Sequence, residues 1–148
     1  DTIMKILNEF KLTVDSKSVN ESFCRVVVTA FASALDPTIE EITDLKTAVS
    51  EAVTNSIVHG YADTCGTIYI TGQLLENDVI KIKIKDKGRG IADVSEAMTP
   101  LYTTGGSDRA GLGFTVMQSF CDRVKVTSSL GMGTTVVLTK KINGRTKW

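Results

Sequence analysis

The sequence predicts an α/β (α+β sandwich) fold, in which a mostly antiparallel sheet is covered on one face by helices. Segments with alternating apolar and polar residues, which are typical of strands, occur near the N-terminus and again in the second half of the chain. Two segments with apolar residues at helical spacing lie between them. The expected order is β-α-α-β-β-loop-α-β-β, and a chain of 148 residues is expected to form a single domain, residues 1–148.

The N-terminal part is expected to hold one strand and one helix. Residues 5–14 alternate between apolar and polar side chains, as a half-buried strand does. Ser18 and Glu21 have the spacing of a capping box, and Asn20 is a rival cap. The helix that follows is expected to end near Leu35.

A second, longer helix is expected next. Asp36-Pro37 is interpreted as a cap followed by proline at the first helical position. Apolar residues then recur at helical spacing from Ile39 to Ile57, and Gly60 is expected to end the helix.

The second half of the chain predicts two hairpins. Residues 67–75 and 79–85 flank a short connection, and the second of these segments alternates isoleucine with lysine, which indicates one buried and one solvated face. Residues 86–113 are rich in Gly, Ser and Thr. The remaining expected elements are a short helical piece at 94–98, a helix at 114–121, and strands at 124–129 and 134–142.

Composition limits the classes of function. Lys plus Arg (17) equals Asp plus Glu (17), so no global field draws the chain to nucleic acid or membrane, and partner recognition has to be local. Cys24, Cys65 and Cys121 are an odd set without Cys-x-x-Cys spacing, which argues against a disulfide framework or a zinc site and favours a cytoplasmic location. No signal peptide or membrane span is recognised, and Met4 is a candidate start residue.

The second helix carries three polar side chains at regular spacing. Glu51, Asn55 and His59 are spaced i, i+4, i+8 and line one slowly drifting face. Asn55 falls between Val53 and Ile57, where a core-facing stripe would not place an amide. The alternative is that Glu51 and Asn55 lie on the solvated side, and that His59 satisfies carbonyls at the helix end rather than taking part in catalysis.

Asp86-Lys87-Gly88-Arg89-Gly90 directly follows a predicted strand. An aspartate at the end of a buried strand can accept a hydrogen bond from an exocyclic amine, and Gly88 and Gly90 allow the backbone to approach a planar ring. The alternative is a plain turn, since Asp and Gly are common turn residues.

Two further glycine segments complete the set. Gly111-Leu112-Gly113 precedes a helix expected to begin near Phe114, and amides at a helix N-terminus suit a triphosphate. The polar run at 103–110 resembles a lid in composition, although ordinary surface loops share that composition. Gly131-x-Gly133-Thr134-Thr135 is equally compatible with a hairpin turn.

The ordered combination of these four segments resembles the GHKL superfamily, whose ATP site is built from an N box on a helix and three glycine-containing boxes. The N box would be residues 51–60, and the glycine boxes would start at Asp86, Gly111 and Gly131. The resemblance covers nearly the whole chain and implies the Bergerat-type ATP-binding fold. Closer matches are to the sporulation members of the anti-sigma serine kinases, with the general stress members as the nearest alternative; the matching segments are 20–26, 35–38, 49–55, 59–61 and 100–104.

The resemblance implies roles for the catalytic base, the metal ligand and the residues that bind adenine. Glu51 would orient or deprotonate a serine hydroxyl, which requires only hydrogen-bond reach. Asn55 would bind Mg²⁺, a cation that prefers oxygen ligands, and would thereby contact the nucleotide. Asp86 would bind the adenine amine, and the base pocket would be completed by Gly88, Gly90 and Thr135.

It also implies roles for the phosphate-binding segments and for a partner surface. Gly111 and Gly113 would cradle phosphates, and Thr104 of the lid would contact the nucleotide. Arg109 would neutralise charge on the γ-phosphate during transfer, as a catalytic residue. The lid departs from the family pattern because it lacks the lysine and proline expected after the paired threonines. Arg25 on the first helix would contact protein partners.

The resulting expectation is a cytoplasmic protein serine kinase that uses ATP and Mg²⁺, cycles to ADP, phosphorylates an anti-anti-sigma protein and holds a sigma factor inactive. Such a partner switch is expected to be a homodimer with no direct contact to nucleic acid or membrane. A non-catalytic, nucleotide-gated binding module is the alternative, and it would not need Glu51. Two other classes that share these boxes are not expected. Sensor histidine kinases carry a phosphoacceptor histidine on a dimerisation segment, and gyrase-type or chaperone-type ATPases need further domains.

Overall fold

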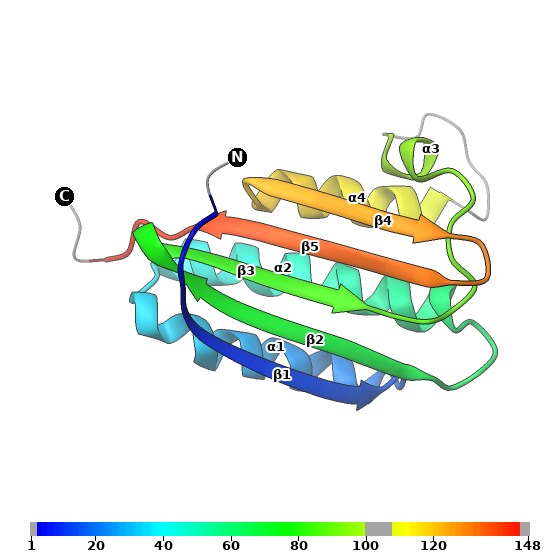
Figure 1. Cartoon of the computed structure of the whole chain (residues 1–148), viewed down its shortest axis with the longest axis horizontal. Helices are drawn as coiled ribbons and strands as arrows, with labels where there is room; N and C mark the ends of the chain where they lie inside the picture. The colour runs from blue at the N-terminus through cyan, green and yellow to red at the C-terminus, as the bar shows by residue number, and fades with distance from the viewer. Residues whose placement is uncertain (1–2, 100–107, 146–148) are drawn as a thin grey trace.

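A computed structural model describes residues 3–99 and 108–145. These residues form two layers, a five-stranded sheet and a layer of helices packed on one of its faces (Figure 1). The strand order is β1-β2-β3-β5-β4, and every neighbouring pair is antiparallel. The strands are β1 Ile6–Asp15, β2 Thr67–Leu75, β3 Val79–Lys85, β4 Arg123–Ser129 and β5 Gly133–Lys141.

The helical layer consists mainly of α1, α2 and α4, with α2 in contact with both of the others. In the described part of the chain, no helix combines the length and the apolar character needed to cross a bilayer. The helical segments are α1 Val19–Ala32, η1 Ser33–Leu35, α2 Ile39–Asn55, η2 Ser56–Gly60, η3 Glu76–Asp78, α3 Val94–Met98 and α4 Asp108–Phe120.

The core lies between the two layers and confirms the predicted fold class. Ile80, Ile82 and Ile84 of β3 are buried against the helices, so the lysines that alternate with them point to the opposite face of the sheet. Burial of these apolar side chains is the main stabilising contribution to such a domain. The helices contribute buried side chains that include Leu45, Val49, Val53, Phe114 and Met117.

The first predicted cap is wrong. Ser18 is the N-cap residue of α1, but its side chain makes no capping hydrogen bond. Glu21 instead accepts a 3.3 Å hydrogen bond from Thr54 of α2, and its other oxygen lies 3.4 Å from Arg25 Nε. Asn20 donates to the Asp15 carbonyl rather than capping the helix. The tertiary contact with α2 therefore replaces the predicted capping box.

The predicted start of the second helix is also wrong. Thr38, not Asp36, caps α2, and it forms a reciprocal capping box with Glu41. Asp36 adopts a left-handed conformation with φ of 49°, and its side chain accepts two hydrogen bonds from the Arg145 guanidinium. Asp36 thus belongs to the connection that the C-terminal segment holds in place.

Helix α4 begins earlier than predicted. It starts at Asp108 rather than near Phe114, so Gly111, Leu112 and Gly113 lie within the helix and not in front of it. Its packing on α2, which buries Phe114 and Met117, outweighs the low helix propensity of the two glycines. The two hairpins and the short helix α3 agree with the prediction.

Candidate functional site

Helix α2 presents Glu51 and Asn55 to helix α4. A Cβ atom placed on Gly113 would lie 3.1 Å from Glu51 Oε2 and 3.3 Å from Asn55 Nδ2. Both polar side chains are partly exposed. They lie against the backbone of α4 at Gly113, which has no side chain. The four-residue spacing on α2 has therefore brought a carboxylate and an amide to one spot.

The amide of Asn55 has an unsatisfied hydrogen-bonding group. Its Nδ2 is buried and has no hydrogen-bond partner among the residues that the structure describes. Such a group is rare in folded proteins and calls for a physical explanation. An oxygen-rich ligand beside Gly113 would satisfy it, because the amide offers one acceptor oxygen and two donor hydrogens.

A π-helical turn follows directly after Asn55. Tyr61 N–H donates to the Ser56 carbonyl five residues earlier, which gives the wider turn of η2. Turns of this kind occur frequently at functional sites. Here the turn places Ser56 Oγ 2.8 Å from Asp86 Oδ2 and lays Gly60 against the Asp86 carboxylate.

Asp86 is a buried carboxylate, with 3% of its surface exposed. Its position follows from the register of β3 and β5, since Lys85 pairs with Thr135 and the next residues, Asp86 and Thr134, exchange backbone hydrogen bonds. Oδ1 accepts hydrogen bonds from Gly88 N–H at 2.9 Å and from Thr134 N–H at 3.2 Å. These donors, with Ser56, fix the carboxylate in one orientation.

Glycine is required around Asp86 for reasons of backbone packing. A Cβ on Gly88 would lie 2.1 Å from the Gly60 carbonyl oxygen, and Arg89 N–H donates to the same oxygen. Gly90 has φ of +76°, and a Cβ there would lie 2.0 Å from the Ser129 carbonyl oxygen. Both glycines therefore join the segment after β3 to its neighbours as well as bordering the site.

A small cavity of about 40 Å³ lies beside Asp86. It brings together the end of α2, the turn η2, the segment after β3, and strand β5. Its wall is mostly apolar, with a few polar groups that converge on it, as in typical small-molecule sites. The lining residues are Ala52, Asn55, Ser56, His59, Gly60, Asp86, Gly90, Ile91, Phe114, Thr134 and Val136.

The structure places Thr134, not Thr135, at this cavity. Alternate residues of a strand face opposite sides of the sheet, and Thr134 shares its side with buried Val136. Thr135 consequently faces the open side, where it pairs with Lys85 of β3. Thr134 Oγ1 lies 2.8 Å from Ser128 Oγ, so its orientation is also defined.

The other sequence-predicted residues fall in three places. Thr104 lies outside the described residues. Arg109 and Gly111 lie in the first turns of α4, where only the backbone is described. Arg25 lines a separate groove on the outer side of α1 and α2, together with Val26, Thr29 and Lys46.

Sequence reasoning missed Ser56 and Thr134. Ser56 follows the N-box asparagine, and only the π turn and the β3 neighbour show that its hydroxyl meets Asp86. Thr134 could have been found from the strand period, because it lies two residues before Val136, on the buried face of the predicted strand.

The residues present fit a nucleotide and a divalent cation. Asp86 has a fixed acceptor at the cavity wall, which suits an exocyclic amine. The orphaned Asn55 amide beside Gly113 suits phosphate oxygens and the oxygen-rich shell of Mg²⁺. Glu51 lies next to Asn55 on the same face, within the same group of side chains.

Comparison with solved structures identifies the fold. The chain is similar to a crystal structure of the RsbU and RsbW domains of a Mycobacterium tuberculosis protein, with a TM-score of 0.67 and 17% identity over 91% of this chain and 32% of that chain. It is also similar to the histidine kinase domain of a blue-light activated histidine kinase from Erythrobacter litoralis, with a TM-score of 0.54 and 16% identity, covering 83% of this chain and 61% of that one.

Comparison of sequences identifies the family. The model for the histidine kinase-like ATPase domain matches residues 14–140. An anti-sigma F factor from Caldanaerobacter subterraneus is 55% identical over 94% of this chain and 97% of the relative, and one from Bacillus subtilis is 49% identical over 92% and 94%. The chain therefore belongs to the anti-sigma F factor group within the histidine kinase-like ATPase (GHKL) family.

Proposed function

We propose that this protein is an ATP- and Mg²⁺-dependent protein serine kinase that also binds and inhibits a sporulation sigma factor. The observation that carries the proposal is the meeting of Glu51, Asn55 and Gly113, with the Asn55 amide buried and unsatisfied. A binding module without catalysis would need the Asp86 cavity but not a carboxylate beside the phosphate-binding segment.

Asp86 sets the position of the nucleotide. Its hydrogen bonds from Ser56, Gly88 and Thr134 hold the carboxylate in one orientation, so its oxygens are positioned to accept a hydrogen bond from the adenine amine. The small, mostly apolar cavity would receive an edge of the base. Adenine recognition is thus assigned to the end of the site formed by β3, β5 and η2.

Glu51 and Asn55 serve the other end of the nucleotide. Asn55 Oδ1 would hold Mg²⁺, and Gly113 leaves the space into which the phosphates fit. Bound Mg²⁺ neutralises negative charge on the phosphates. Glu51 would accept the proton of the substrate hydroxyl, or orient that hydroxyl, from a position adjacent to Asn55. Arg109 and Thr104 are proposed to contact the phosphates from α4 and from the segment before it.

The names of the relatives support one of the proposed partners, a sigma factor. The anti-sigma F factors by name act on a sigma factor, and the proposed substrate is a serine of an anti-anti-sigma protein. Arg25 is exposed over part of its side chain on α1 and is proposed to contact the sigma factor. A homodimer in the cytoplasm, in which nucleotide state selects the partner, completes the proposed switch.

The test is a phosphoryl-transfer assay with γ-labelled ATP, Mg²⁺ and a candidate anti-anti-sigma protein. The wild type should label a serine of the partner, and Glu51→Gln should abolish the label while nucleotide still binds. Glu40→Gln is the matched control, since Glu40 is an exposed glutamate in the first turn of the same helix. Transfer by Glu51→Gln would remove Glu51 from the mechanism, and absence of transfer by the wild type would favour a nucleotide-gated binding module.

A further inference from the structure

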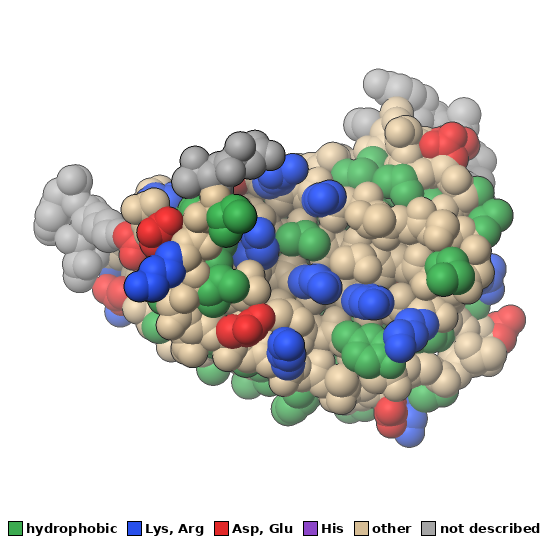
Figure 2. All heavy atoms as spheres, in the orientation of Figure 1, with side chains coloured by type: hydrophobic (Ala, Val, Ile, Leu, Met, Phe, Trp, Pro, Cys, Tyr) green, Lys and Arg blue, Asp and Glu red, His purple; other side chains and the backbone are tan. Residues whose placement is uncertain are grey.

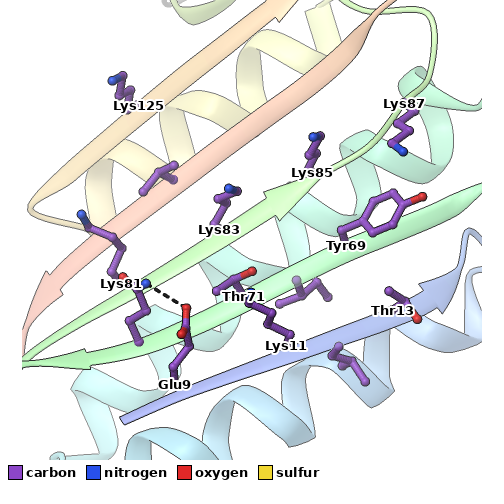
Figure 3. Close-up of a pocket in the computed structure, with 14 residues that line it drawn as sticks. Glu9, Lys11, Thr13, Tyr69, Thr71, Lys81, Lys83, Lys85, Lys87 and Lys125 are labelled. Carbon is purple, nitrogen blue, oxygen red and sulfur yellow. Dashed lines mark hydrogen bonds between the residues drawn. The ribbon is translucent and has the colours of Figure 1, made fainter. Parts of the chain in front are cut away.

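The sheet face opposite the helices carries a broad groove of about 710 Å³. Figure 2 shows basic side chains gathered across the middle of this face, and Figure 3 shows them rising from neighbouring strands. The groove lies on the other side of the sheet from the Asp86 cavity, since Val137 lines the groove and Val136 lines the cavity. Its charged lining residues are Glu9, Lys11, Lys81, Lys83, Lys85, Lys87 and Lys125, which we call the lysine face.

The strand period and the sheet register together create this surface. Lys81, Lys83 and Lys85 form a column along β3, because alternate residues point the same way. Lys83 also belongs to a row across the sheet, in which the paired positions are Lys11, Thr71, Lys83, Val137 and Lys125. A chain with no net charge has thus concentrated six lysines and one glutamate on one surface.

Within the described part of the chain, these lysines form no ion pairs. Among the residues that the structure describes, no carboxylate lies within 4.0 Å of any of the six ammonium groups. Glu9 accepts a 3.0 Å hydrogen bond from Gln73, shown as the dashed line in Figure 3. Like charges on one surface repel, so a protein retains such a cluster at some loss of stability, and an anionic partner relieves the repulsion.

We propose that the lysine face docks an extended acidic segment of a partner protein, a role that does not depend on the proposed kinase activity. Adjacent lysines of the β3 column are two residues apart, or about 6.6 Å along the strand. Alternate side chains of an extended peptide have the same spacing, so carboxylates at every second position match the column. The lysines of the cross-strand row then contact the same segment from either side.

Two other occupants fit less well. Nucleic-acid surfaces typically use arginine and exposed aromatic rings. Among the described residues, no arginine lines this groove, and Lys87 Nζ lies 5.0 Å over the ring of Tyr69. A second copy related by a twofold axis would bring the same patch against itself, lysines facing lysines. Carboxylates on a flexible partner segment meet neither obstacle.

The experiment measures binding of a fluorescent peptide that alternates glutamate with threonine, by anisotropy at low ionic strength. The wild type should bind it, and a glutamine-threonine peptide should not bind. The variant Lys81→Gln/Lys83→Gln/Lys85→Gln should bind roughly tenfold more weakly. The control Lys5→Gln/Lys17→Gln/Lys46→Gln removes the same charge at residues that do not line this groove, and it should bind as the wild type does.

Three results would overturn the proposal. Equal weakening in both triple variants would reduce the effect to net charge, and tighter binding of a single-stranded oligothymidine than of the acidic peptide would make this a nucleic-acid surface. A self-association constant changed in the column variant but not in the control, measured by sedimentation, would place a second copy on this face. Thermal unfolding of each variant, compared with that of the wild type, verifies that loss of binding is not loss of fold.

Discussion

Ser56 Oγ donates a 2.8 Å hydrogen bond to the buried carboxylate of Asp86, joining the π turn after α2 to the end of β3. This contact connects the two halves of the site, because Asn55 immediately precedes Ser56 and Gly88 follows Asp86 by two residues. It makes the geometry of the proposed adenine-binding end dependent on the geometry of the helix that carries Glu51 and Asn55.

Replacing Ser56 by alanine is expected to lower both stability and nucleotide affinity. The buried Asp86 oxygen would lose its donor, which costs about 1.5–3 kcal/mol for a hydrogen bond to a charged group. ADP binding should weaken roughly tenfold, because the carboxylate loses its fixed orientation. Urea unfolding and calorimetric titration measure the two effects. Ser119→Ala is the control, since Ser119 is exposed and bonds only to its own helix.

Replacing Gly113 by alanine is expected to separate stability from activity. Alanine favours a helix over glycine by about 1 kcal/mol, so α4 itself should not be weakened. The added methyl would lie 3.1 Å from Glu51 Oε2 and must displace Glu51 or Asn55. We expect near-normal thermal unfolding with strongly reduced binding of Mg²⁺-ATP. Unchanged affinity would show that the space beside Gly113 is not used by the phosphates.

Thr38→Ala should destabilise the protein by about 1 kcal/mol, because it removes the side-chain cap of α2. Ser18→Ala is the matched comparison at the start of α1, and it should change the free energy of unfolding little, because Ser18 makes no capping hydrogen bond. Urea denaturation of both variants measures the difference. Equal losses would contradict the assignment of caps made from these contacts.

Stability is expected to fall in acid through Glu41. Burial acts to raise its pKa, but hydrogen bonds from the backbone N–H groups of Thr38, Asn143 and Gly144 act in the opposite direction, and the net pKa is lowered from 4.5. A pKa below its unfolded value means that the stabilisation is full above the unfolded value. It is then lost as pH falls through the lower, folded value.

The measurement is the free energy of urea unfolding at a series of pH values from about 6 down to about 3, a range that brackets the usual glutamate pKa. Glu41→Gln should be less stable than the wild type at neutral pH and should show a smaller decline in acid. A decline as steep as that of the wild type would assign the pH dependence to other carboxylates.

Some elements were predictable because their signals are local. The alternation of isoleucine and lysine in β3 is a period of two, and the spacing of Glu51 and Asn55 is a helical period, so each defines which side chains share a face. These patterns require no knowledge of the rest of the molecule. The fold class and the face carrying Glu51 and Asn55 follow from them.

Other features depend on partners that are distant in the chain. Asp36 preceded by a helix and followed by proline resembles a cap, but Arg145 engages its side chain, and Thr38 caps α2 instead. Helix α4 extends back to Asp108 through two glycines because its packing on α2 outweighs their low helix propensity.

By itself, the sequence determined the order of the strands and helices, the buried face of the patterned segments, and which four segments carry the nucleotide-binding pattern. Only the tertiary structure decided that Ser56 and Thr134 meet Asp86, and that Lys11, Lys83 and Lys125 share one row of the sheet. The physical reason is that periodicity is a property of neighbouring residues. Register, by contrast, results from hydrogen bonding and packing between strands far apart in the chain.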